Sequence, residues 1–163
     1  MGTVSAIDVE DVVWQRIDEQ ATVGEVRRTV ARLAGSIGIS EARVAEISVA
    51  VSELATNSVL HATGGVALVR CRRNDEARVV ELIVIDSGPG IDAKTAEQLF
   101  QPFFTTKSSG MGLGLSICKS IIEAHGGQLT VASREPQGAV FRVELPRHRH
   151  ARKSAGRLGR RAG

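Results

Sequence analysis

Three short polar clusters interrupt a chain that is otherwise rich in apolar residues, and each contains residue types that can do chemistry. In sequence order they are residues 53–57 (ELATN), 86–90 (DSGPG) and 110–115 (GMGLGL). Their carboxylates, amide and glycines could contact a metal ion, a base and a phosphate. Each cluster also has an ordinary structural explanation by itself, so their order and their positions on the predicted elements decide what they indicate.

The first cluster falls on a predicted helix with a polar face. Glu53, Asn57 and His61 are spaced by four residues, so they share one face of that helix. The amide oxygen of Asn57 is a neutral, hard ligand of the kind that Mg²⁺ accepts beside phosphate oxygens and water. The carboxylate of Glu53, one turn earlier, could take a proton from an attacking hydroxyl or water. A solvated helix face would explain the same spacing if this helix stood alone.

The second cluster begins where a predicted apolar strand ends. Asp86 places a hydrogen-bond acceptor at the end of a rigid element, where it could accept from the exocyclic amine of adenine. Guanine would present an oxygen at the same edge and would be repelled. Gly88 and Gly90 have no side chains, so a flat base could lie against their backbone. An ordinary β-turn is the simpler alternative for this segment.

The third cluster leads directly into a predicted helix, whose N-terminal amides and dipole favour a phosphate. The spacing of its glycines is GxGxG, and the cluster follows a loop, so a dinucleotide-binding Rossmann fingerprint fits poorly. Lys107, three residues before Gly110, supplies a cation that could reach terminal phosphates. A flexible loop before a helix would explain this segment alone, but the coincidence of three such clusters in this order favours a nucleotide site.

The elements that must position these clusters are short strands and amphipathic helices. Residues 22–25 (TVGE) fit a capping box that opens a helix to about residue 37. The second helix follows Ser40, and its apolar residues recur every three or four positions as one buried stripe: Val44, Ile47, Val51 and Leu54. We predict strands at 12–17, 66–71, 79–85, 128–133 and 139–145, a turn at 74–75, and helices at 93–100 and 113–124. This order predicts an α/β fold, a two-layer sandwich in which helices cover one face of a mixed, mostly antiparallel sheet.

Composition limits the classes of protein that remain. We expect one domain over residues 1–146 and a disordered basic tail over 147–163. The tail holds seven of the 21 Lys and Arg residues, which leaves 14 basic against 18 acidic residues, so nucleic-acid binding is not expected. The sequence has no apolar run of membrane-spanning length and no apparent signal peptide, which favours the cytoplasm. Cys71 and Cys118 are predicted to be buried free thiols.

These residues resemble the boxes of the GHKL superfamily of ATPases and kinases, which share the Bergerat fold. Residues 53–61 look like its N box, 86–90 its G1 box, 99–104 its F box, 110–115 its G2 box and 138–141 a weaker G3 box, with Ala139 where Thr is frequent. The resemblance covers about residues 10–146. It implies ATP and Mg²⁺ as cofactors, with Asn57 on the metal, Asp86 on adenine and the loop from about 92 to 109 as a lid. The remaining implied nucleotide contacts are His61, Gly88, Gly90, Thr105, Thr106, Lys107, Gly110, Met111, Gly112, Leu113, Gly114 and Leu115.

The two halves of the chain resemble different subfamilies. The segment 115–127 is similar to the catalytic domain of sensor histidine kinases, whereas 50–62 is more similar to anti-sigma-factor and switch-type serine kinases. In the latter, a Glu matching Glu53 is the expected base. No histidine precedes the second helix, so autophosphorylation in the usual histidine-kinase manner is not expected.

We therefore predict a protein serine/threonine kinase that transfers the γ-phosphoryl group of ATP to a regulatory partner such as an anti-sigma antagonist. A sigma factor is a further candidate partner, and so is a second copy of the chain in a homodimer. The alternatives are a histidine-kinase catalytic domain whose acceptor lies on another chain, and a non-catalytic module that binds a regulator. For His125, at a helix end, a C-terminal cation is the simplest interpretation.

Overall fold

A computed structural model of the protein describes residues 8–61, 64–73, 77–105 and 111–147. In chain order the elements are β1 (Asp8–Ile17), α1 (Gln20–Ser36), α2 (Glu41–His61), β2 (Gly65–Arg73), β3 (Arg78–Asp86), α3 (Ala93–Gln98), α4 (Gly114–Ala124), β4 (Gln128–Ser133) and β5 (Ala139–Pro146). Each predicted strand and helix is present. The turn at 74–75 and the tail from 148 onward lie outside the described residues.

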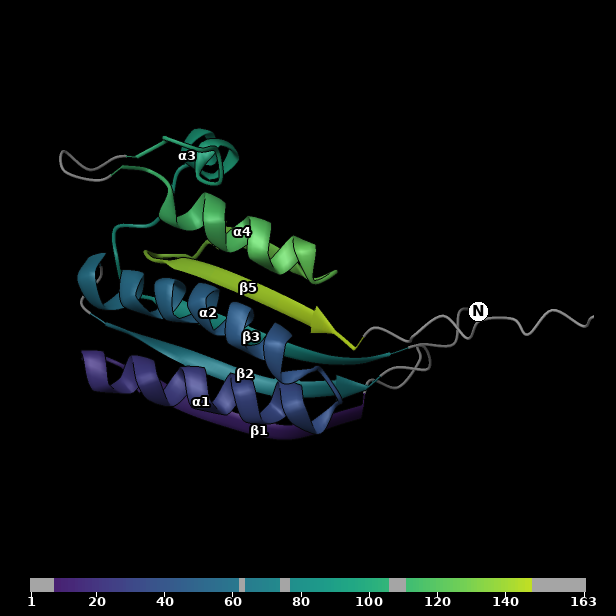
Figure 1. Ribbon diagram of the computed structural model, residues 1–163. Helices are drawn as coiled ribbons and strands as arrows, with labels where there is room; N and C mark the ends of the chain where they lie inside the picture. Colours follow the sequence, from purple (N-terminus) through teal and green to yellow (C-terminus); the bar gives the residue numbers. More distant parts are fainter. Residues whose placement is uncertain (1–7, 62–63, 74–76, 106–110, 148–163) are drawn as a thin grey trace, which may run out of the picture.

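The strands form one sheet in the order β1-β2-β3-β5-β4. All four pairings in the described residues are antiparallel, so the parallel component that a mixed sheet would need is not found there. Helices α1, α2 and α4 lie side by side over one face of the sheet, and α3 lies apart from them near the start of α4 (Figure 1). The predicted two-layer α/β sandwich is confirmed.

Local interactions determine where the helices begin. Helix α1 starts two residues before the predicted capping box, because Thr22 forms its capping contacts with Glu19 and not with Glu25. The backbone N–H of Glu19 donates to Thr22 Oγ1 at 3.4 Å, and the Thr22 hydroxyl donates to the Glu19 carbonyl at 2.7 Å. Asp92 caps α3 by accepting from the backbone N–H of Thr95 at 2.9 Å.

The core lies between the helices and the sheet. The predicted stripe on α2 faces it: Ile47, Val51 and Leu54 are at most 2% exposed, and Val44 packs against its margin. Both cysteines are buried and free, as predicted. Among the described residues, no helix combines the length and the apolar character needed to cross a membrane.

Part of the opposite face of the sheet is covered by charged side chains. Glu81 on β3 is only 1% exposed and forms ion pairs with Arg70, Arg72 and Arg142 from the neighbouring strands. Arg72 also pairs with Glu144. A buried carboxylate is stable only with such partners, so these arginines shield this part of the sheet from water.

Candidate nucleotide site

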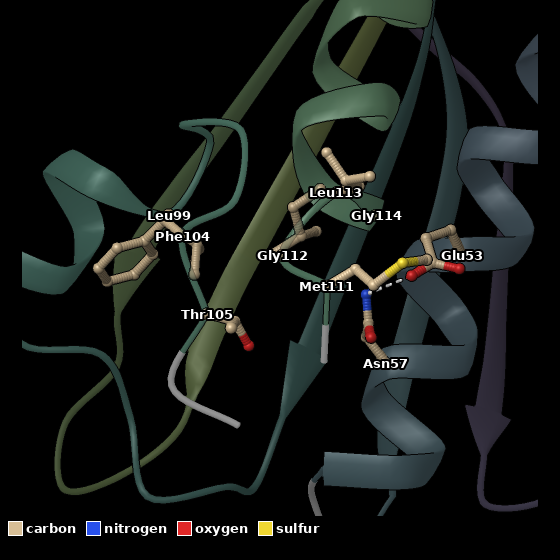
Figure 2. Close-up of a pocket in the computed structure, with 10 residues that line it drawn as sticks. Glu53, Asn57, Leu99, Phe104, Thr105, Met111, Gly112, Leu113 and Gly114 are labelled. Carbon is tan, nitrogen blue, oxygen red and sulfur yellow. Dashed lines mark hydrogen bonds between the residues drawn. The ribbon is translucent and has the colours of Figure 1, made fainter. Parts of the chain in front are cut away.

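Helix α2 places two polar side chains at one end of a cleft. Glu53 and Asn57 are half-buried and lie on the same face of the helix, one turn apart. Asn57 Nδ2 donates to Glu53 Oε1 at 3.4 Å (Figure 2). With the amide nitrogen turned to Glu53, the amide oxygen Oδ1 is the atom available to a cation.

The start of α4 forms the opposite wall of this end of the cleft. A cavity of about 260 Å³ opens beside the contact between the two helices, and it is lined by Glu53, Asn57, Leu99, Phe104, Thr105, Met111, Gly112, Leu113, Gly114 and Leu115. A Cβ at position 114 would come closer than 3.0 Å to Glu53 Oε1, so any side chain there would force the end of the flexible Glu53 side chain to move. The predicted meeting of the first and third clusters is confirmed in these residues.

Two parts of the segment between α3 and α4 are hydrogen-bonded to each other beside this cavity. The backbone N–H of Phe103 donates to the carbonyl of Gly112 at 2.9 Å. Gly112 has a φ of 67°, and a Cβ on it would overlap the backbone of residues 103–104. Phe103 itself has a φ of 66°, a conformation that costs free energy for a side chain of this size. Phe103, within the expected lid, is therefore held to the residues that lead into α4.

The other end of the cleft is built around Asp86. Its Oδ1 accepts from the backbone N–H groups of Gly88 and Ala139, both at 3.0 Å. Among the described residues Oδ2 has no such donor, and it is the oxygen left for a ligand. A Cβ on Gly138 would overlap the Asp86 carbonyl, which explains why glycine precedes Ala139. Ala139 acts here through its backbone, so a methyl side chain at this position does not disturb the contact.

This second cavity measures about 180 Å³ and joins the first. Its lining residues are Asn57, Ser58, Asp86, Gly88, Pro89, Gly90, Ile91, Leu99, Leu115, Ala139 and Phe141. Three of them, Asn57, Leu99 and Leu115, also line the cavity beside Glu53. The result is one continuous cleft with an apolar, flat-walled end at Asp86 and a polar end at Glu53 and Asn57.

Most of the predicted site residues line this cleft. Thr106, Lys107 and Gly110 lie outside the described residues, as does the side chain of His61, whose backbone ends α2. The sequence did not single out Ser58, Ile91, Leu99, Phe104 and Phe141 as site residues, although Leu99 and Phe104 belong to the predicted F box. Apolar wall residues of this kind have no chemical signature and are identified only from the fold.

The interpretation of His125 as a cation at a helix end is wrong. The guanidinium of Arg43 donates from Nε to His125 Nδ1 at 3.1 Å, so this ring nitrogen carries a lone pair and no proton. The other ring nitrogen lies 3.0 Å from Glu46 Oε2 and donates to it. The ring is therefore neutral in this arrangement, and both of its nitrogens are engaged.

The donor set at the polar end fits Mg²⁺ bound together with phosphates. The described residues hold no group of three or more His, Cys, Asp or Glu side chains that could bind a metal by themselves. Mg²⁺ commonly uses one or two protein oxygens and completes its shell with phosphate oxygens and water. The free Oδ1 of Asn57 meets that requirement.

Comparison with known proteins identifies the family. The sequence model of the family described as "Histidine kinase-, DNA gyrase B-, and HSP90-like ATPase" matches residues 42–149. The sensor histidine kinase ZraS of Salmonella typhi is 34% identical over 151 residues, which are 88% of this chain and 31% of that protein. The chain spans a third or less of the length of the first curated relatives it matches.

Solved structures agree with the sequence match. The mycobacterial sensor histidine kinase MprB aligns with a TM-score of 0.56 and 25% identity over 82% of this chain and 97% of that one. The catalytic domain of the histidine kinase ThkA aligns with a TM-score of 0.53 and 28% identity, again over 82% and 97%. The family match covers more than half of the chain, and with these structures it shows that the chain belongs to the histidine kinase-, DNA gyrase B- and HSP90-like ATPases, the GHKL superfamily.

Proposed function

We propose that this chain is the ATP-binding catalytic domain of a histidine kinase, which transfers the γ-phosphoryl group of ATP to a histidine outside the segment described here. The observation that carries the proposal is the alignment with the ThkA catalytic domain over 97% of that domain. The curated relatives are also sensor histidine kinases. This similarity favours a histidine acceptor over the serine or threonine acceptor that Glu53 suggests.

ATP would lie along the cleft with its adenine at Asp86. Two backbone N–H groups donate to Oδ1 of this carboxylate and fix the orientation of the side chain. The position of Oδ2 is therefore fixed as well. Oδ2 would accept from the exocyclic amine of adenine. Leu99, Leu115 and Phe141 supply apolar walls against which the base can pack.

The phosphates would lie between α2 and the start of α4. Backbone N–H groups in the first turn of α4 have no partner within the helix, and together with the helix dipole they favour an anion. Asn57 Oδ1 would hold Mg²⁺ together with phosphate oxygens. When bound, the metal neutralises charge that develops on the phosphates, and positioning and electrostatics provide most of the catalysis in phosphoryl transfer.

The transfer step forms a bond between an imidazole nitrogen of the acceptor and the γ-phosphorus, and it breaks the bond from that phosphorus to the bridging oxygen of ADP. The attacking nitrogen has a lone pair and no proton, so no base is required beside it. Glu53 would then act by accepting the hydrogen bond of Asn57 and fixing the direction of its amide oxygen. His125 is not a candidate acceptor, since it is 8% exposed and both ring nitrogens are engaged.

The proposal is tested by the chemical stability of the product. The protein is incubated with ATP labelled at the γ-phosphate and a lysate of its source organism, and labelled proteins are treated with acid or alkali. We expect a label on another polypeptide that survives alkali and is lost in acid, as phosphohistidine behaves. The Asn57→Ala variant should give no label. An acid-stable label would show that the acceptor is a hydroxyl group and not a histidine.

One observation favours a serine or threonine acceptor as the second candidate. The Glu53 carboxylate lines the cavity where the terminal phosphate would lie, which is where a base for an attacking hydroxyl is needed. In this reading the partner would be a regulatory protein of the anti-sigma type. Binding of ATP without any labelled protein would instead favour the non-catalytic regulator-binding module.

A further inference from the structure

Helices α2 and α4 are joined by a cluster of polar side chains at the end of α4 that is far from the cleft. Arg43 on α2 donates from Nε to His125 Nδ1 at 3.1 Å and from Nη2 to the His125 carbonyl at 2.6 Å. Glu46, one turn further along α2, accepts from His125 Nε2 at 3.0 Å. His125 is the C-terminal cap of α4 and is 8% exposed. We call these three residues the distal clamp.

The distal clamp belongs to a series of contacts with a constant register along the two helices. Position 43 contacts 125, the thiol of Cys118 donates to the Ala50 carbonyl at 3.6 Å, and Glu53 lies against Gly114. Numbers rise along α2 as they fall along α4, so the helices are antiparallel. The last contact of the series is part of the phosphate end of the cleft. The distal clamp and the Glu53 carboxylate therefore lie at opposite ends of one helix–helix pairing.

Between these ends the outer surfaces of the two helices do not interlock. A groove of about 520 Å³ opens there, and its walls are largely small or apolar side chains, including Ala45, Ser48, Val49, Ser52, Ile117 and Ile121. The hydroxyls of Ser48 and Ser52 donate to carbonyls of their own helix, at 2.7 and 2.8 Å. They therefore do not connect α2 to α4. Among the described residues, the directional polar contacts between α2 and α4 are those of the distal clamp and of the Cys118 thiol.

We propose that the distal clamp positions α4 relative to α2 and thereby sets the width of the phosphate end of the cleft. Arg43 forms two hydrogen bonds in a fixed fork, and His125 accepts one of them only in its neutral form with the proton on Nε2. This pairing defines one position of α4. A shift of α4 along its axis would move Gly114 away from Glu53 and Asn57. The inference rests on the proposed nucleotide site, but it does not depend on which residue accepts the phosphoryl group.

Two ligands separate this positioning role from general loosening of the fold. We expect Arg43→Ala to weaken binding of the non-hydrolysable analogue AMP-PNP roughly tenfold, and Arg43→Lys, which retains charge but not the fork, to weaken it less. Binding of adenosine should weaken much less, because Asp86, Gly88 and Ala139 lie on or beside the strands β3 and β5, and Leu115 is the α4 residue among those that line this end of the cleft. Arg78→Ala is the matched control. Among the described residues it removes one ion pair, with Glu10 on β1 at 3.0 Å, and it should change neither affinity.

A double-mutant cycle tests the coupling itself. Position 43 is about 15 Å along α2 from position 53, at 1.5 Å per residue, and substitutions so far apart normally have additive effects. If the distal clamp acts through α4, Arg43→Ala should cost much less AMP-PNP affinity in a Gly114→Ala background, where the added methyl group has already disrupted the contact between Glu53 and α4. Additive effects, or an equal loss of adenosine binding, would overturn the proposal. If the parent protein does not bind AMP-PNP, the nucleotide site itself is wrong, which is a different outcome.

Discussion

The carboxylate of Glu53 lies directly against Gly114, the first residue of α4, and a side chain at that position would displace it. This contact joins the first and third polar clusters of the sequence. Gly114 has an ordinary negative φ, so its backbone does not require glycine, and the constraint comes from the neighbouring carboxylate alone. Substitutions at Gly114 and Glu53 should therefore be tested both singly and in combination.

We expect Gly114→Ala to destabilise the parent protein by no more than about 1 kcal/mol, because the atom in the way, Glu53 Oε1, is the end of a flexible side chain that can turn aside. In the Glu53→Ala background the obstacle is absent, and the same substitution should stabilise α4, because alanine favours a helix by about 1 kcal/mol over glycine. Denaturant unfolding of the two single variants and the double variant measures both effects. An equal cost in both backgrounds would mean that the Glu53 contact is not the cause.

The sequence predicted the elements of this fold because its signals are local. Alternation in the strands, the apolar stripe of α2 and the glycines at element ends are each contained within a few residues. The predicted cleft depended on three local clusters, and the sheet brings those together. The start of α1 was misplaced because Glu19 and Glu25 are equally plausible partners for Thr22 on spacing alone.

The sequence could not reveal contacts between distant segments. Arg43 and His125 are separated by most of the domain, and nothing in either segment points to the other. Without Arg43, a histidine at the end of a helix is reasonably interpreted as a cation, and the structure shows why that fails. The sequence does not identify the acceptor type for a related reason, since a carboxylate such as Glu53 has the same sequence signature whether it removes a proton or holds an asparagine.

Asp86→Asn should change the preferred base. The oxygen of the new amide will remain where Asp86 Oδ1 accepts from Gly88 and Ala139, because both N–H groups need an acceptor. The amide NH₂ then faces the ligand and repels the exocyclic amine of adenine. Binding of ATP should weaken by roughly tenfold to a hundredfold, the value of a hydrogen bond to a charged group.

Inosine triphosphate provides the matched ligand for this variant, since its base presents an oxygen where adenine has the amine. We expect Asp86→Asn to bind it better than the parent protein does, as measured by calorimetry with both nucleotides. A uniform loss of affinity for both would show that Asp86 supports the fold of the pocket without reading the base.

Cys118 should make the stability of the protein depend on alkaline pH. Burial, aided by the nearby Glu53 carboxylate, raises the pKa of its thiol from 9.0 to about 12. The folded state thus holds the thiol proton more tightly than the unfolded state. The resulting stabilisation is complete below pH 9 and is lost as the pH rises towards 12.

Denaturant midpoints measured from pH 8 to 11 should therefore fall more steeply for the parent protein than for Cys118→Ala, which lacks this ionisation. Cys71 and the other titrating groups are common to both proteins, so the difference between the two curves isolates Cys118. Parallel curves would contradict the assigned cause.

Glu81 should contribute strongly to stability although it lies on the face of the sheet opposite the helices. Its removal in Glu81→Ala leaves three arginines facing one another without their shared acceptor. Breaking a buried ion pair from one side costs about 3–5 kcal/mol, and we expect a loss near the lower end because the arginines are partly exposed. Arg16→Ala, which removes an exposed pair with Asp18, should change the free energy of unfolding by less than about 0.5 kcal/mol.

The Glu53→Gln variant distinguishes two roles of Glu53: accepting the hydrogen bond of Asn57 and acting as a general base. Glutamine keeps an oxygen that can accept from Asn57 Nδ2, so the direction of the Asn57 amide and the binding of Mg²⁺ and ATP should be nearly unchanged. It cannot act as a base. With a histidine acceptor the rate of transfer should stay within about tenfold of the parent, whereas loss of a general base for a hydroxyl acceptor costs roughly a hundredfold or more. Single-turnover transfer from labelled ATP, measured at saturating nucleotide, compares the two proteins directly. Glu53→Ala, which removes the acceptor for Asn57 as well, should weaken ATP binding under either mechanism and serves as the reference for lost positioning.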